Sequence, residues 1–112
     1  MNGAEVKTIT VEQLHALSRE RTVDLVDVRT AEEFTEVRAS IARHVPMHTI
    51  DPHDVVQSRA GERDDPLYFI CHLGGRSHRV CEAFMAAGYP NVVNVVGGTE
   101  AWEEAGLPVE RG

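Results

Sequence analysis

Short apolar runs alternate along this chain with segments whose apolar residues recur at helical spacing. The strongest runs predict strands at Val23–Val28, Leu67–Cys71 and Asn91–Val96. The first run has apolar residues at neighbouring positions, as expected for a strand covered on both faces. Weaker stretches predict an edge strand at Lys7–Ile9 and a short strand at Arg43–Pro46, which proline ends.

Helix start signals lie between these strands. Thr10–Gln13 and Thr30–Glu33 both fit a capping box, in which a threonine and the residue three positions later cap each other's backbone. Asp51 before Pro52 is typical of an N-cap and a first helical residue. The first predicted helix begins after Thr10. Four more are predicted at Thr30 to about Val37, at Asp51 to about Ala60, at Ser77–Ala87 and near Thr99–Ala105. A polar loop is predicted at Gly61–Pro66. This alternation predicts an α/β fold with a mainly parallel sheet, as one domain over residues 1–112.

The composition restricts the classes of function. The chain has 112 residues, and 11 basic against 18 acidic residues give a net charge of −7. This balance argues against nucleic acid or an anionic membrane as a partner, because both are bound through basic patches. No segment approaches the length of a membrane span and the first residues lack a signal-peptide pattern, so we expect a cytoplasmic protein. Two cysteines are too few for a disulfide framework.

The segment Ile70–Ser77 carries the candidate chemistry. Cys71 ends a buried strand, a glycine loop follows, and a helix begins. Ligands of open α/β sheets bind outside the carboxyl ends of the strands. A glycine loop and a helix N-terminus at that place direct several backbone N–H groups at one atom, which stabilises a thiolate and lowers its pKa. We therefore predict that Cys71 is a nucleophile, with Arg76 and His72 adding positive potential. The alternative is that Cys71 is a small apolar residue of the core.

Three motifs resemble the rhodanese-like domain family. Cys71–Ser77 is similar to its C-x-x-G-x-R-S active-site loop. Leu25–Arg29 with Glu32–Phe34 resembles its D-V-R…E-E-F signature, and Gly97–Val109 resembles its G-G…A-W…A-G-L-P-V ending. The resemblance implies a three-layer α/β sandwich with a mainly parallel five-stranded sheet and helices on both faces. The stretch Val37–Ala42 departs from the family's G-H-I-x-G-A, which leaves the strand boundary in this region open.

The resemblance also implies a sulfurtransferase reaction. A small anionic donor such as thiosulfate gives its sulfane sulfur to Cys71, and the resulting persulfide passes the sulfur to a thiol, to a protein acceptor or to cyanide. The loop residues that would cradle this persulfide are His72, Leu73, Gly74, Gly75, Arg76 and Ser77. Arg76 would orient the donor's oxygens or brace the loop. We predict no cofactor.

Asp27 and Arg29 lie at the carboxyl end of their own strand, as Cys71 does. They shape the site, with Asp27 paired to Arg76, or they form a structural ion pair that pins the loop. Cys81 packs in the core of the following helix, or it forms a resolving disulfide with Cys71.

A metal site is a further alternative, because His78 and Cys81 are three residues apart and His72 is near them in sequence. A structural zinc site needs four ligands in compact pairs, and the other histidines are scattered, so we predict no metal.

Two rival functions are compatible with the loop. A phosphatase or arsenate reductase of this architecture has its arginine six positions after the cysteine, whereas Arg76 is five positions after Cys71. The shorter loop suits one sulfur atom better than a tetrahedral oxyanion. A non-enzymatic sulfur-relay or regulatory binding module is the second rival.

Overall fold

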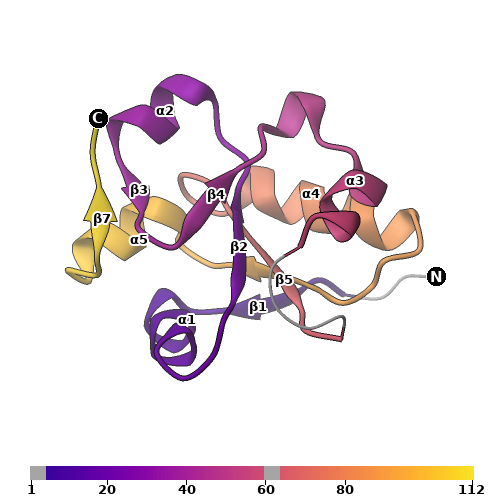
Figure 1. Cartoon of the computed structure of the whole chain (residues 1–112), viewed down its shortest axis with the longest axis horizontal. Helices are drawn as coiled ribbons and strands as arrows, with labels where there is room; N and C mark the ends of the chain where they lie inside the picture. The colour runs from indigo at the N-terminus through magenta and orange to yellow at the C-terminus, as the bar shows by residue number, and fades with distance from the viewer. Residues whose placement is uncertain (1–4, 60–63) are drawn as a thin grey trace.

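The computed structural model describes residues 5–59 and 64–112. A five-stranded sheet lies at its centre, with strand order β1-β6-β5-β2-β4 (Figure 1). All four pairs of neighbouring strands are parallel. The strands are β1 (Lys7–Ile9), β2 (Asp24–Asp27), β4 (Ala42–His44), β5 (Leu67–Ile70) and β6 (Val92–Val95). This confirms the predicted mainly parallel sheet.

Helices cover both faces of the sheet, which confirms the three-layer arrangement. The α-helices are α1 (Val11–Ser18), α2 (Ala31–Glu36), α3 (Pro52–Gln57), α4 (Gly75–Ala86) and α5 (Gly98–Glu104), and η1 (Met47–Thr49) is a 3₁₀ turn. Side chains of α1 and α5 share one apolar core, and those of α3 and α4 share the other. In the described residues, none of these helices is long and apolar enough to cross a bilayer.

Strand β5 contributes to both cores, which explains its unbroken apolar run. Phe69 packs on the α4 side, where its ring centroid lies 4.7 Å from that of Phe84. Tyr68 and Ile70 point to the other face, into the core that contains the fully buried Trp102. A strand with apolar neighbours on both faces has no polar side to alternate with.

Both predicted capping boxes form. At the start of α1, the Thr10 hydroxyl accepts the Gln13 N–H at 3.1 Å, and the Gln13 side chain accepts the Thr10 N–H at 3.0 Å. At the start of α2, Thr30 and Glu33 make the same reciprocal pair at 3.2 and 3.1 Å. Each pair satisfies two N–H groups that would otherwise lack a partner at the helix end.

The chain differs from the sequence prediction in several places. Strand β4 covers Ala42–His44 instead of Arg43–Pro46, because Ala42 pairs with β2 and Pro46 has no N–H to extend the ladder. An unpredicted two-stranded antiparallel sheet joins β3 (Arg38–Ala39) to β7 (Val109–Glu110). Helix α2 ends at Glu36, and α3 ends at Gln57. The predicted helix end at Ala60 and the first part of the predicted loop, Gly61–Arg63, lie outside the described residues, as do residues 1–4 of the N-terminal segment.

Candidate active site

Cys71 lies directly after β5, at the carboxyl edge of the sheet, and α4 starts four residues later. Gly74 is the N-cap of α4 and has a φ of +115°, a conformation that other residues rarely adopt. This turn makes Gly75 the first helical residue, two positions earlier than predicted. It also directs the Gly74 N–H at the Cys71 sulfur, with a nitrogen–sulfur distance of 3.0 Å.

The Cys71 sulfur is buried among hydrogen-bond donors. The residue is 1% exposed, and the Ser77 hydroxyl also contacts its Sγ at 3.3 Å. Burial raises the pKa of the Cys71 thiol, but hydrogen bonds from the Ser77 hydroxyl and from the N–H groups of Ser77, Gly74 and Leu73 more than offset it, so the pKa is lowered overall. A lowered pKa increases the fraction of thiolate, which is the reactive form of cysteine.

Strand β6 supports the loop through Asn94. The Asn94 amide nitrogen donates to the Gly74 carbonyl at 3.1 Å, and its oxygen lies 2.5 Å from the Ser77 hydroxyl oxygen. Both Asn94 and Ser77 are buried, so these bonds are shielded from water. Gly74 and Ser77, the two residues that contact the sulfur, are therefore both hydrogen-bonded to a residue of the neighbouring strand β6.

The start of α5 supports the other side of the loop. The Thr99 N–H and hydroxyl both donate to the Cys71 carbonyl, at 2.8 and 3.1 Å. Gly98 approaches so closely that a Cβ atom added there would lie 2.4 Å from the His72 carbonyl oxygen. Only glycine fits this contact between the two loops.

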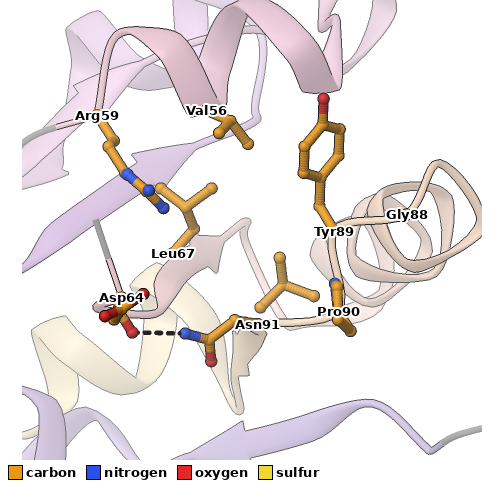
Figure 2. Close-up of a pocket in the computed structure, with 9 residues that line it drawn as sticks. Val56, Arg59, Asp64, Leu67, Gly88, Tyr89, Pro90 and Asn91 are labelled. Carbon is orange, nitrogen blue, oxygen red and sulfur yellow. Dashed lines mark hydrogen bonds between the residues drawn. The ribbon is translucent and has the colours of Figure 1, made fainter. Parts of the chain in front are cut away.

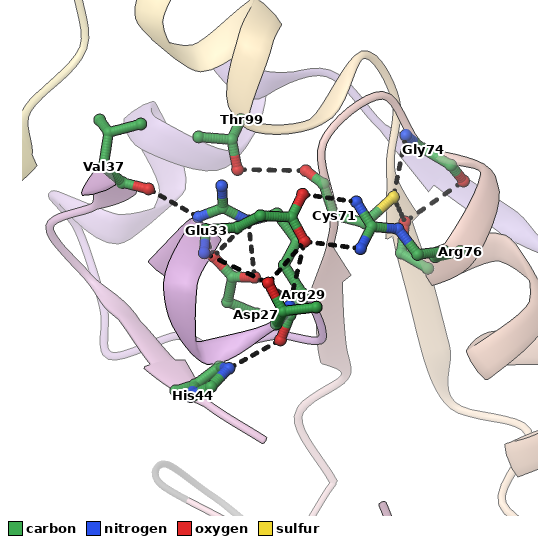
Figure 3. A network of polar contacts seen from close by, with 11 residues as sticks. Asp27, Arg29, Glu33, Val37, His44, Cys71, Gly74, Arg76 and Thr99 are labelled. Atoms are coloured by element: carbon green, nitrogen blue, oxygen red, sulfur yellow. Dashed lines mark hydrogen bonds and ion pairs between the residues drawn. The ribbon is translucent and has the colours of Figure 1, made fainter. Parts of the chain in front are cut away.

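Arg76 is engaged by Glu33 of α2 (Figure 3). Its two terminal nitrogens contact the two carboxylate oxygens at 2.8 and 2.9 Å, a bidentate ion pair. The hydrogen bond from Arg76, which outweighs partial burial and is helped by Thr30, lowers the pKa of Glu33 to about 2. Of the two roles expected for Arg76, this contact corresponds to bracing the loop.

Asp27 and Arg29 form a separate buried ion pair, with the closest nitrogen–oxygen distance at 2.7 Å. Arg29 also donates to the Val37 carbonyl at 2.7 Å, and the Arg29 carbonyl lies 2.7 Å from a ring nitrogen of His44. Asp27 thus takes Arg29 as its partner rather than Arg76. The pair ties β2, β4 and the segment after α2 together beside the loop.

Two side chains of the loop face outward. Leu73 is 58% exposed, and the half-exposed His72 side chain lies 3.9 Å from the Glu100 carboxylate. A cavity of about 320 Å³ adjoins this side of the loop and is lined by His72, Thr99, Arg29 and Glu33, among others.

A different cavity, of about 240 Å³, lies at the opposite edge of the sheet (Figure 2). It is lined by residues at the beginnings of β5 and β6, including Leu67 and Asn91, and by Tyr89 before β6. The Asn91 amide donates to the Asp64 carbonyl across its floor at 2.8 Å. Because Cys71 lies at the carboxyl end of β5, this cavity takes no part in chemistry at its sulfur.

Cys81 is fully buried on the core-facing side of α4, and both cysteines are free thiols. Burial, with the nearby charge of Glu82, raises the pKa of Cys81 to about 12. His78 points to Glu82 at 3.6 Å. Across residues 5–59 and 64–112, no three histidine, cysteine or acidic side chains gather as a metal-binding group.

Comparison with known proteins agrees with this geometry. The model of the family described as "Rhodanese-like domain" matches residues 10–105. The chain belongs to the rhodanese-like domain family. It is 33% identical over 106 residues to thiosulfate sulfurtransferase GlpE of Actinobacillus succinogenes, with 91% of this chain and 88% of that protein covered. It is 34% identical over 85 residues to a sulfurtransferase of Allochromatium vinosum, with 76% of each covered.

Solved structures show the same rhodanese-like fold. A rhodanese-like domain protein from Staphylococcus aureus superposes with a TM-score of 0.71 at 35% identity, covering 87% of this chain and 91% of that one. Family membership, together with relatives named as sulfurtransferases, supports sulfur transfer as the activity of the family.

The sequence pattern predicts Cys71 and its loop as the site but not three residues that support the loop. The sequence prediction gives Glu33 no role beyond the capping box and the E-E-F signature, and it treats Asn94 and Thr99 only as parts of a strand and a helix. Their roles depend on contacts between elements, for which a single sequence carries no local signal.

Proposed function

We propose that this rhodanese-like domain is a sulfurtransferase in which Cys71 carries sulfur as a persulfide. The sulfur comes from a small anionic sulfane donor of the thiosulfate type and passes to a thiol or to cyanide. The observation that carries this proposal is the Cys71 sulfur itself, buried and surrounded by the donors of Gly74, Ser77 and Leu73.

In the loading step, the Cys71 thiolate attacks the outer sulfur of the donor. The sulfur–sulfur bond of thiosulfate breaks, and sulfite leaves with the bonding electron pair. A thiolate and a dianion thus become a persulfide anion and a dianion, so that charge and electrons balance. The N–H groups that stabilise the thiolate are placed to stabilise the persulfide anion, which carries the same charge.

In the unloading step, the acceptor attacks the outer sulfur of the persulfide. With cyanide, the new carbon–sulfur bond gives thiocyanate, and the electron pair of the broken sulfur–sulfur bond returns to Cys71. The thiolate is regenerated without a cofactor. His72 and Leu73, on the exposed rim of the loop, are the residues that an approaching acceptor meets first.

Oxyanion chemistry fits this loop less well. A phosphatase needs an arginine free to hold the oxygens of the transferred phosphoryl group. Here Arg76 comes five residues after Cys71, and both of its terminal nitrogens are held by Glu33. The remaining rival is a non-enzymatic module, either a relay that carries a persulfide to one dedicated protein or a regulatory binding module.

Intact-protein mass spectrometry tests the proposal. Incubation with thiosulfate is expected to add one sulfur atom, about 32 Da, to the wild type, and cyanide is expected to remove it. Cys71→Ser should gain nothing, whereas Cys81→Ser, which alters the buried thiol away from the loop, should behave as the wild type. A persulfide that forms but turns over slowly on cyanide and small thiols would favour the relay. No adduct with thiosulfate or with an organic persulfide would contradict the proposal.

A further inference from the structure

The two capping boxes of this chain differ in one informative way. Gln13 completes the box of α1 without a charge, and Glu33 completes that of α2 with the same pattern of bonds. A glutamine at position 33 would keep the two reciprocal bonds of the capping box, as Gln13 does at the start of α1. The capping bonds therefore do not require the negative charge of Glu33.

That charge is used on Arg76 instead. Glu33 contacts both terminal nitrogens of the guanidinium, from a helix 43 residues away in sequence. Arg76 is the arginine of the loop, and its charge interacts with Glu33 and with the Cys71 thiolate, both of which raise the pKa of Arg76. In Figure 3 its guanidinium lies between the Glu33 carboxylate and the Cys71 sulfur.

The other charges near the loop do not replace it. Arg29 is held by Asp27 in a buried pair, and His72 faces the carboxylate of Glu100. The backbone N–H groups of the loop that donate to the Cys71 sulfur are not available to the oxygens of a donor. The oxygens of an incoming dianion therefore meet arginines that are already matched by carboxylates, in a protein of net charge −7.

We propose that Glu33 is a specificity-determining residue that slows loading by dianionic sulfur donors such as thiosulfate without preventing it. By occupying both arms of Arg76, Glu33 withholds the guanidinium that would bind the oxygens of thiosulfate. Donors that bring one charge or none, such as a small organic persulfide, lose nothing by this. The inference rests on the proposed sulfur transfer: thiosulfate remains a donor that loads Cys71, and the inference ranks it below donors of lower charge.

The chemistry with such a donor balances. The Cys71 thiolate attacks the outer sulfur of R–S–SH, the sulfur–sulfur bond of the donor breaks, and R–S⁻ leaves with the electron pair. The product is the Cys71 persulfide in its protonated form, and the single negative charge passes to the leaving thiolate. No oxygen atoms need a partner at any stage.

The first test is Glu33→Gln, which removes the charge but keeps the capping box. Its matched control is Glu32→Gln, which makes the same change in net charge one residue earlier in the same helix turn. We expect kcat/KM for loading by thiosulfate to rise about tenfold in Glu33→Gln, mainly through a lower KM. The same constant for 2-hydroxyethyl persulfide should change less than about twofold, and Glu32→Gln should change neither donor by more than that.

A second measurement separates this inference from the proposed function. Cys71→Ser cannot form a persulfide, but it keeps the surroundings in which a donor binds. Calorimetric titration with thiosulfate should give a lower Kd, by about tenfold, for Cys71→Ser/Glu33→Gln than for Cys71→Ser. The gain should vanish when Arg76→Ala is added, because no guanidinium is then released.

The outcomes are distinct. A thiosulfate-selective gain that depends on Arg76 supports the specificity role. Equal loss of loading by both donors in Glu33→Gln would show that the pair only braces the loop and would overturn the inference, while leaving sulfur transfer intact. Tighter thiosulfate binding in the Cys71→Ser series, without persulfide formation in any variant that retains Cys71, would instead overturn the proposed function.

Discussion

Cys71 and Cys81 are two buried thiols with opposite electrostatic surroundings. Cys81 is surrounded by apolar side chains of the core, and burial raises its pKa to about 12. Cys71 is also buried, yet hydrogen bonds from the loop and from Ser77 overcome the cost of burial and lower its pKa. The contrast shows that the fate of a buried thiol depends on the donors that reach its sulfur, because burial alone disfavours the charged form.

Ser77→Ala tests this balance at the scale of one atom. The substitution removes the hydroxyl that contacts Sγ at 3.3 Å, so the thiolate loses a donor and the pKa of Cys71 rises. A higher pKa leaves less thiolate at neutral pH, and alkylation by iodoacetamide at pH 7 should slow by about tenfold. The midpoint of the rate against pH should move to higher pH.

Ser58→Ala is the matched control for this measurement. The Ser58 hydroxyl contacts Arg43 and the Val55 carbonyl, and neither residue belongs to the loop. Its pH profile should follow that of the wild type, and Cys71→Ser gives the background rate. An unchanged midpoint in Ser77→Ala would mean that the backbone N–H groups alone set the pKa of Cys71.

At the scale of elements, the sequence is sufficient to predict a helix or strand wherever the signal is local. Capping boxes at Thr10 and Thr30 and the apolar run of β5 each determine their element within a few residues. Strands β3 and β7 have two residues each, too few for any periodicity, and they pair across 72 residues between Arg38 and Glu110. The early start of α4 depends on the positive φ of Gly74. Because Gly74 and Gly75 are adjacent, the sequence alone does not show which of the two adopts this conformation.

The candidate site divides in the same way. Cys71 and the loop are contiguous and carry a family motif, so the sequence alone is enough to predict them as the site. The Glu33–Arg76 pair joins α2 to α4, and the Asn94–Ser77 contact joins β6 to α4. Such contacts depend on the relative placement of elements, which the pattern of one chain does not encode.

Gly98→Ala tests the contact between the start of α5 and the loop. Gly98 has a φ of +60°, and a Cβ there would meet the carbonyl oxygens of His72 and Cys71 at 2.4 and 2.5 Å. Strain from the backbone and from the overlap should together cost about 2 to 5 kcal/mol of unfolding free energy. Loading of Cys71 should also slow, because the displaced carbonyls belong to the loop.

Gly106→Ala provides the matched control. Gly106 also has a positive φ, +71°, but a Cβ there meets nothing within 4 Å. The backbone cost alone should be about 1 to 2 kcal/mol in urea unfolding, with loading unchanged. Equal destabilisation by the two substitutions would show that α5 and the loop adapt to one another without cost.

At the scale of the whole molecule, the parallel sheet brings the residues of the site together. Because all five strands run the same way, the segments that follow β2, β5 and β6 emerge at one edge. Asp27, Cys71 and Gly97 lie at or just after these strand ends, and helices α2, α4 and α5 begin there. The fold thereby brings several helix N-termini to a chain whose overall charge repels anions.

The helix N-termini at the site attract anions, whereas the net charge of the protein repels them, and this contrast predicts how salt affects the loading of Cys71. Thiosulfate is a dianion and the protein carries −7, so the long-range force between them is repulsive. Added salt screens that repulsion, and kcat/KM for thiosulfate should rise several-fold between about 20 mM and about 300 mM sodium chloride. Alkylation of Cys71 by iodoacetamide, which is neutral, should change little over the same range and reports any direct effect of salt on the thiolate. A fall in kcat/KM for thiosulfate with added salt would mean that the loop attracts the donor over a distance, as an Arg76 released from Glu33 would. The charge that controls loading would then lie at the site and not over the whole surface.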